Sequence, residues 1–177
     1  MTDAYPAPGG PGGSEDVIRA ADGVIAPGEY AHQVTIGQVT LYWRNDADYL
    51  YLAAEAQTSG WLGVGLDPQN QMQGADYVIA AAQGNALAVY DAYGQAPVGA
   101  THPQDTDIGG SDDFIASAVL RQDGWVRVEV VKPLDSGDAY DRVLQPGGTY
   151  AVIVATGTDT QFNSRHSFRA AGEITLD

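Results

Sequence analysis

The sequence of 177 residues contains no cysteine. It therefore forms no disulfide, no zinc–thiolate site and no iron–sulfur cluster, and it lacks the C-x-x-C-H motif that attaches haem covalently. Blue copper sites need a cysteine thiolate, so they are excluded as well. A chain without cysteine is compatible with an exported protein.

Positive charge is scarce too. Eight Lys and Arg residues stand against 23 Asp and Glu, which gives a net charge of −15, and Lys132 is the single lysine. Nucleic-acid binding is excluded, because phosphates are held by a cationic surface that this chain does not have. An acidic surface instead favours a partner protein with a basic docking face, and an association rate that falls with salt.

Long apolar runs are missing, since none approaches the ~20 residues needed to cross a bilayer. No basic apolar leader opens the sequence, so we expect a mature form without its own membrane span. The composition fits an extracytoplasmic location, either periplasmic or secreted and surface-anchored. Residues 1–16 are rich in proline and glycine and are expected to form a flexible tail, whereas residues 17–177 have the length of one domain.

Helical periodicity is absent, and strand signals recur about every ten residues instead. These signals predict an all-β protein, an antiparallel immunoglobulin-like β-sandwich of roughly 10 strands with little or no helix. A β-barrel is the structural alternative. The expected strands are Val39–Trp43, Tyr49–Ala56, Trp61–Leu66, Asp76–Ala82, Ala86–Asp91, Phe114–Leu120, Trp125–Val131, Tyr150–Ala155 and Glu173–Leu176.

Catalytic motifs are also lacking. There is no nucleophile elbow, no glycine-rich phosphate loop and no H-E-x-x-H motif, so we do not expect an enzyme. The acidic loop 105–113 fails the EF-hand spacing, because Ala116 stands where a Glu is required. A solvated acidic loop is the favoured interpretation, and a calcium site of another type stays open.

Met72 and His166 are the two residues with the clearest chemical potential. Met72 lies in a polar turn between two expected strands, where a thioether is a poor packing choice but a possible ligand for a soft metal or haem iron. His166 lies between the last two expected strands, and imidazole is a common metal and haem ligand. A solvated histidine is the simpler alternative.

Aromatic side chains offer a different function. A sugar-binding platform could be built from tryptophan and tyrosine on one face of a sandwich, although the same residues commonly fill its core. The candidates are Trp43, Trp61, Trp125, Tyr90 and Tyr93. A carbohydrate-binding module is therefore the alternative hypothesis.

The sequence resembles the DOMON domain family, and in particular its haem-binding branch, which includes the cytochrome domain of cellobiose dehydrogenase. The most specific part is Gly60-Trp61 followed by Met72-Gln-Gly-Ala-Asp76. Further matching segments are Val39–Trp43, Tyr49–Leu52, Tyr90–Tyr93, Lys132–Leu134 and Gly172–Leu176.

This resemblance implies a b-type cytochrome domain in which Met72 and His166 are the axial ligands of one non-covalent haem b. It implies one-electron transfer to or from a redox partner, either a dehydrogenase or a membrane cytochrome. A six-coordinate iron leaves no open site for substrate chemistry. The remaining expected contacts are Tyr77, Tyr93 and Phe168 against the haem faces, and Arg165 or Arg169 near a propionate.

Overall fold

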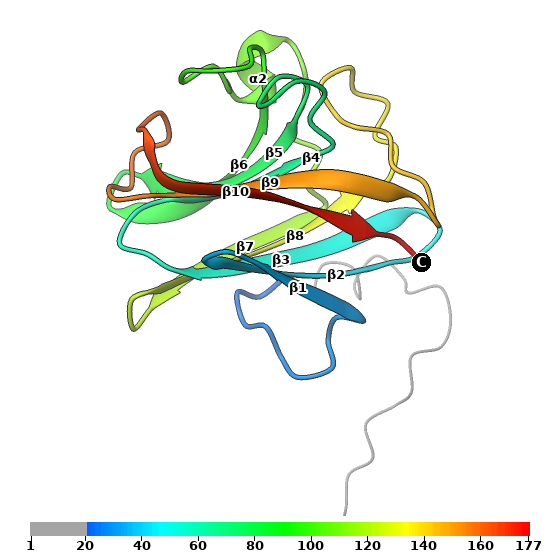
Figure 1. Ribbon diagram of the computed structural model, residues 1–177, viewed down its shortest axis with the longest axis horizontal. Coiled ribbons are helices and arrows are strands. Elements are labelled where there is room, and N and C mark those ends of the chain that lie inside the picture. Colours follow the sequence, from blue (N-terminus) through cyan, green and yellow to red (C-terminus); the bar gives the residue numbers. More distant parts are fainter. Residues whose placement is uncertain (1–20) are drawn as a thin grey trace, which may run out of the picture.

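The computed structural model describes residues 21–177, which form two antiparallel sheets packed face to face (Figure 1). The predicted β-sandwich is thereby confirmed. The expected tail, residues 1–16, and the first residues of the expected domain, 17–20, lie outside the described part of the chain. No helix within residues 21–177 is long and apolar enough to cross a membrane.

The first sheet has five strands in the order β1-β2-β3-β8-β7. Each strand is antiparallel to its neighbours. The strands are β1 (His32–Ile36), β2 (Val39–Asn45), β3 (Tyr49–Gln57), β8 (Trp125–Pro133) and β7 (Ala116–Gln122).

The second sheet also has five strands, in the order β10-β9-β4-β5-β6, and lies against the first sheet (Figure 1). A short helix, α2 (Asp105–Ile108), interrupts the connection from this sheet to β7. The strands are β10 (His166–Thr175), β9 (Thr149–Gly157), β4 (Leu62–Leu66), β5 (Asp76–Gln83) and β6 (Ala86–Tyr93).

Two tight hairpins follow the expected turn chemistry. Gly84 joins β5 to β6 with φ 61°, and Asp123-Gly124 joins β7 to β8 with φ 53° and 80°. Asp-Gly tolerates these left-handed conformations, which match the twist of the strands. Turn residues therefore located both hairpins in the sequence.

The expected strands differ from the observed ones mainly at β1 and β10, and by one or two residues at other strand ends. β1 was not predicted, and β10 begins at His166 instead of Glu173. The segment from His166 to Gly172 contains arginine, alanine and glycine, which carry little strand preference, so its pairing with β9 forms the strand. His166 consequently belongs to a strand end and not to a free loop.

The core fills the layer between the sheets with alternating apolar residues. On β2 the buried side chains are Val39, Leu41 and Trp43, and on β4 they are Leu62, Val64 and Leu66. All five residues of β4 are buried, including the glycines on its other face. The strand β4 is thus buried on both faces.

Val64 offers a direct test of this core, because it is fully buried while Val143 is 54% exposed. Val64→Ala should lower the free energy of unfolding by about 2 kcal/mol, since two buried methyl groups are lost. Val143→Ala, the matched control, should change it by less than about 0.5 kcal/mol. Urea unfolding measures both, and equal losses would contradict the assigned core.

Candidate functional site

The outer face of the second sheet is apolar, although it does not face the first sheet. Its buried residues form a second hydrophobic cluster around Trp61, Tyr77, Ile79 and Ala92, with Ile153 packed at the side. An apolar sheet face that points away from the core needs another cover. This face is therefore a candidate ligand surface.

Two glycines leave the centre of this face without projecting side chains. Gly63 and Gly65 alternate with the inward-pointing residues of β4, so their missing side chains lie on the outer face. A Cβ on Gly65 would lie 2.8 Å from Ile153 and 2.6 Å from Tyr77, which is too close for either contact. The alternation along β4 thus places core side chains on one face of the sheet. It leaves on the other face an apolar surface, called the floor below.

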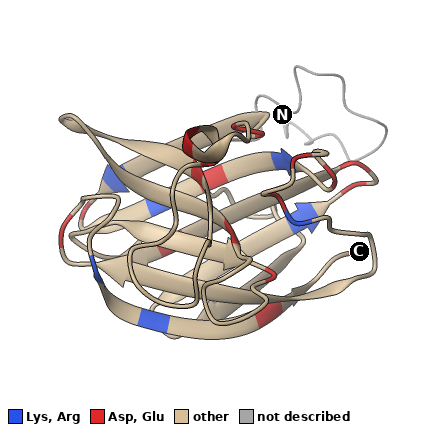
Figure 2. Cartoon of the chain, turned by 90° about the horizontal axis from the view of Figure 1, so that it is seen from above, with Lys and Arg blue, Asp and Glu red and all other residues tan. Residues whose placement is uncertain are grey.

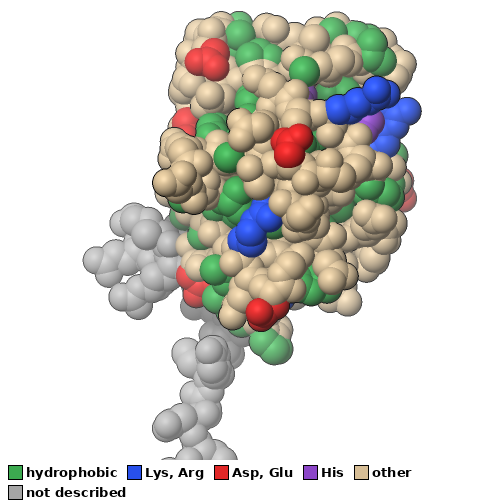
Figure 3. All heavy atoms as spheres, turned by 90° about the vertical axis from the view of Figure 1, so that its left-hand side faces the viewer, with side chains coloured by type: hydrophobic (Ala, Val, Ile, Leu, Met, Phe, Trp, Pro, Cys, Tyr) green, Lys and Arg blue, Asp and Glu red, His purple; other side chains and the backbone are tan. Residues whose placement is uncertain are grey.

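A cavity of about 1060 Å³ lies over this floor. Met72 and His166 both line it, together with Trp61, Tyr77 and Ile153. Figure 3 views the molecule from the left-hand side of Figure 1 and shows basic side chains next to a histidine. The cavity lining includes Arg165 and Arg169 beside His166. The structure therefore brings together two candidate ligands that are far apart in the sequence.

Met72 is held in the turn between β4 and β5. Gln71 has φ 54° and Gly74 has φ 80°, which folds the turn back on itself. The Gly74 amide donates to the Gly94 carbonyl at 2.8 Å, and the Gly94 amide donates to Ala75 at 2.9 Å. A Cβ on Gly94 would overlap the Met72 carbonyl, so this close backbone approach depends on glycine.

His166 is the first residue of β10 and pairs with Gly157 at the end of β9, just before an irregularity in the register. The start of β4 lies at the same end of the sheet, because Leu62 pairs with Thr156 on β9. The turn that carries Met72 follows the other end of β4. The two residues thus approach the floor from opposite ends of its strands.

A third residue with a possible ligand atom, His102, also lines the cavity. No local sequence pattern marks His102 as a functional residue. It is only 7% exposed, and its ring lies 5.4 Å from that of Phe162 and 5.8 Å from that of Tyr77. Burial lowers the pKa of His102, so its imidazole is neutral at pH 7.

Two buried polar atoms of this wall, His102 Nδ1 and Tyr77 Oη, have no hydrogen-bond partner among the described residues. Burial also raises the pKa of Tyr77, which keeps its phenol protonated. Unpaired polar groups in a cavity wall are satisfied by a ligand or by water. By contrast, His32 is remote, since it binds Asp177 at 2.8 Å and stacks on Trp43.

Two residues that were expected to contact haem, Phe168 and Tyr93, do not line the cavity. Phe168 packs against the inter-sheet core beside Gly37, because strand alternation turns it to the face opposite Arg169. Tyr93 packs edge-on against Tyr140 with ring centroids 5.3 Å apart and does not line the cavity. Tyr77, Arg165 and Arg169 do line it.

The aromatic residues weighed for sugar binding do not share a face. Trp43 lies in the inter-sheet core, and Trp61 lies in the cavity wall with its indole N–H donated to Ser164 at 2.9 Å. Trp125 belongs to the first sheet, with Arg127 5.9 Å from its ring. A stacking platform of these three tryptophans is therefore not assembled.

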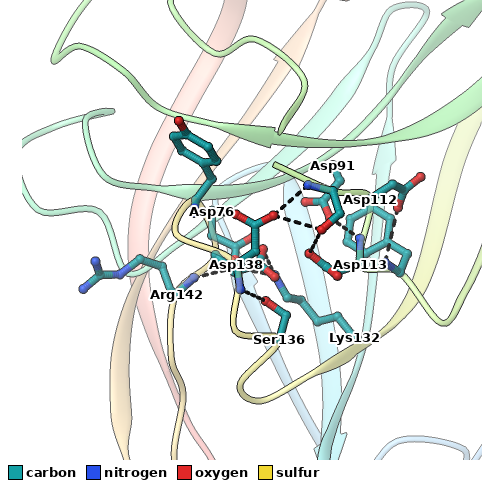
Figure 4. Close-up of polar contacts among 12 residues, drawn as sticks. Asp76, Asp91, Asp112, Asp113, Lys132, Ser136, Asp138 and Arg142 are labelled. Atoms are coloured by element: carbon teal, nitrogen blue, oxygen red, sulfur yellow. Dashed lines mark hydrogen bonds and ion pairs between the residues drawn. The ribbon is translucent and has the colours of Figure 1, made fainter. Parts of the chain in front are cut away.

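Separately, a buried ionic cluster joins the two sheets. Lys132 on β8 is 0% exposed, and its ammonium contacts Asp76 on β5 (Figure 4). The ammonium also contacts Asp141, at 3.0 Å. Burial alone lowers a lysine pKa, but attraction to both carboxylates raises that of Lys132, so it stays charged. Burial also raises the pKa of the neighbouring Asp91 to about 8.

Removing the ammonium should leave these carboxylates unpaired in the core. Lys132→Met should lower the free energy of unfolding at pH 7.5 by about 3–5 kcal/mol, measured by chemical denaturation in a chelator. Arg169→Met, at an exposed cation, is the control and should change it by less than about 0.5 kcal/mol. Similar small losses for both variants would show that the pair contributes little.

The sequence of the chain matches a known domain family. The model of the DOMON domain family matches residues 35–157, and the chain belongs to this family. No curated protein sequence matches it. The family match spans β2 to β9 with the Met72 turn, but ends before His166.

Solved structures agree with this assignment at the level of the fold. The cytochrome b domain of pyranose dehydrogenase from Coprinopsis cinerea is 14% identical, with a TM-score of 0.53 over 77% of this chain and 76% of that one. The cytochrome domain of cellobiose dehydrogenase from Myriococcum thermophilum is 10% identical, with a TM-score of 0.50 over 78% and 75%. A family 9 carbohydrate binding module from Caldicellulosiruptor kristjanssonii is 15% identical, with a TM-score of 0.37 over 98% and 93%.

Proposed function

We propose that this DOMON domain is a b-type cytochrome domain that transfers single electrons through one non-covalent haem b. The observation that carries the proposal is the convergence of Met72 and His166 on one cavity with an apolar floor. The two solved cytochrome domains support it through their shared fold. The proposal makes the chain an electron-transfer module and not an enzyme.

The residues of the cavity fit such a group. Met72 and His166 would hold the iron through a thioether and an imidazole, which are both known haem ligands. The floor offers Ile79, Ile153 and the flat surface over Gly63 to an apolar macrocycle. When bound, haem b would supply a reversible one-electron iron couple, while the protein would supply its ligands and exclude water.

Arg165 and Arg169 would hold the anionic edge of the group. Both line the cavity and are exposed, and neither makes a hydrogen bond, ion pair or aromatic contact within residues 21–177. Guanidinium groups form strong charge-assisted hydrogen bonds with carboxylates. Tyr77 Oη and His102 Nδ1 are two further polar atoms of the wall that a ligand could satisfy.

We also propose that the electron partner is a dehydrogenase or a membrane cytochrome that docks with a basic face. The net charge of −15 supports this choice, and Figure 2 shows acidic residues around α2 and in loops at the strand ends. Such complementarity accelerates encounter. We further propose that this protein and its electron partner meet outside the cytoplasm.

The axial pair is tested by reconstitution with hemin and absorption spectroscopy. His166→Ala should lose most of the haem, because imidazole is the stronger ligand. Met72→Ala should retain part of it, lower the reduction potential and let the reduced iron bind carbon monoxide, since one coordination position opens.

Two histidines serve as controls for that experiment. His32→Ala should leave the low-spin spectrum unchanged, because His32 is remote from the cavity. His102→Ala should also keep a low-spin spectrum, although it removes part of the wall. The assignment fails if His102→Ala abolishes low-spin haem while His166→Ala retains it, or if the double variant of Met72 and His166 binds hemin like the wild type.

The role of the arginines has its own test. The double variant Arg165→Gln, Arg169→Gln should weaken hemin affinity by about tenfold or more, because two charge-assisted contacts to propionates are lost. Arg44→Gln on the first sheet is the matched control and should have no effect, since Arg44 contacts Tyr51 far from the cavity. Unchanged affinity in the double variant would refute the propionate contacts.

A further inference from the structure

Four carboxylates are buried together beside Lys132, on the inner side of the second sheet and away from the haem cavity. Oxygens of Asp76 on β5, Asp91 on β6 and Asp141 in the β8–β9 connection all lie within 4.8 Å of one another. Asp76, Asp91 and Lys132 are drawn together in Figure 4. The fourth, Asp105 on α2, is 1% exposed. It follows Gln104, which pairs with Ala92 next to Asp91, and burial raises its pKa to about 7.

Each of these carboxylates keeps an oxygen without a protein partner. Asp76 accepts from Lys132 and from the Arg142 amide at 3.1 Å, and Asp141 accepts from Lys132 at 3.0 Å, in each case through one oxygen. Asp91 accepts from the Asp113 amide at 3.0 Å, again through one oxygen.

The second oxygens of these three residues, and both oxygens of Asp105, have no hydrogen-bond partner among residues 21–177. A buried carboxylate oxygen without a partner is costly, and four such groups in one place indicate a missing positive group.

The charges of the cluster give the same indication. Fully ionised, as they would be around a cation, Asp76, Asp91 and Asp141 carry three negative charges against the single ammonium of Lys132. Arg142 does not compensate them, because its guanidinium turns away to Asp67 at 2.7 Å. One divalent cation would bring the sum for these four side chains to zero.

We propose that Asp76, Asp91 and Asp141 bind one calcium ion, with Asp105 as a further ligand. The donors are all carboxylate oxygens, which hard cations prefer, and no histidine belongs to the cluster. Calcium accepts carboxylates in irregular arrangements, whereas magnesium demands near-octahedral geometry. The site differs from the acidic loop considered in the sequence, which contributes Asp105 alone.

A calcium ion here would join elements that are distant in the sequence. It would connect β5 and β6 of the second sheet, α2 and the β8–β9 connection around the Lys132 ion pair. Its main effect would be on stability, because the unfolded chain does not hold these groups together. Haem binding at the outer face and calcium binding at the inner face can therefore fail or succeed independently.

The test begins with chelator-treated wild-type protein in a buffer of fixed ionic strength. Isothermal titration should show one calcium ion per chain, and calcium at 100-fold above its Kd should raise the Tm by about 5–10 °C. Magnesium should bind more weakly. Terbium, excited through the protein's aromatic residues, should bind with the same stoichiometry and be displaced by calcium.

Variants then locate the ion. Asp91→Asn and Asp141→Asn should each weaken calcium affinity at least tenfold, whereas Asp107→Asn, at an exposed residue of α2, should leave it unchanged. The terbium titration of wild-type protein decides the question if the buried variants do not fold. The proposal is overturned if wild-type protein binds neither ion at millimolar concentration, or if both buried variants fold and bind calcium like the wild type.

Discussion

The contact between the Lys132 ammonium and Asp76 determines how the two sheets meet. Lys132 comes from β8 of the first sheet and Asp76 from the first position of β5 in the second sheet. A buried charge without its partner is costly, so a placement of the strands that separated Lys132 from Asp76 would be destabilised. Asp76 also follows the Met72 turn by four positions. The contact that closes the core therefore fixes where that turn leaves the sheet.

The second sheet uses strand alternation to serve two purposes. On β4, Leu62, Val64 and Leu66 point into the core, while Gly63 and Gly65 lower the opposite face. The same holds for β5, where Asp76 points inward to Lys132 and Tyr77 outward to the cavity. Because successive residues face opposite sides, a shift of one residue would exchange cavity and core. The ion pair thus protects the register on which the cavity depends.

The sequence predicted most of the fold, because hairpin turns and alternating apolar strands are local signals. It predicted Met72 and His166 through the family resemblance, but no local signal showed that they meet. His102 and the partners of Lys132 were missed, since their burial comes from loops that pack only in the folded chain. The sequence did not show that Phe168 and Tyr93 lie outside the cavity lining, because the register of β10 and the packing of Tyr93 on Tyr140 depend on tertiary contacts.

The cations in the described part of the chain differ in whether they have partners, and those without partners lie at the cavity. Within residues 21–177, Lys132, Arg127 and Arg142 are paired with carboxylates, Arg121 donates to two carbonyls, and Arg44 lies over a tyrosine ring. Arg165 and Arg169 remain without such partners, and both stand at the cavity. In so acidic a chain, uncompensated cations beside an apolar floor match a ligand with an apolar body and an anionic edge. Haem b has that shape and charge, whereas a neutral sugar has no anionic group for the two arginines.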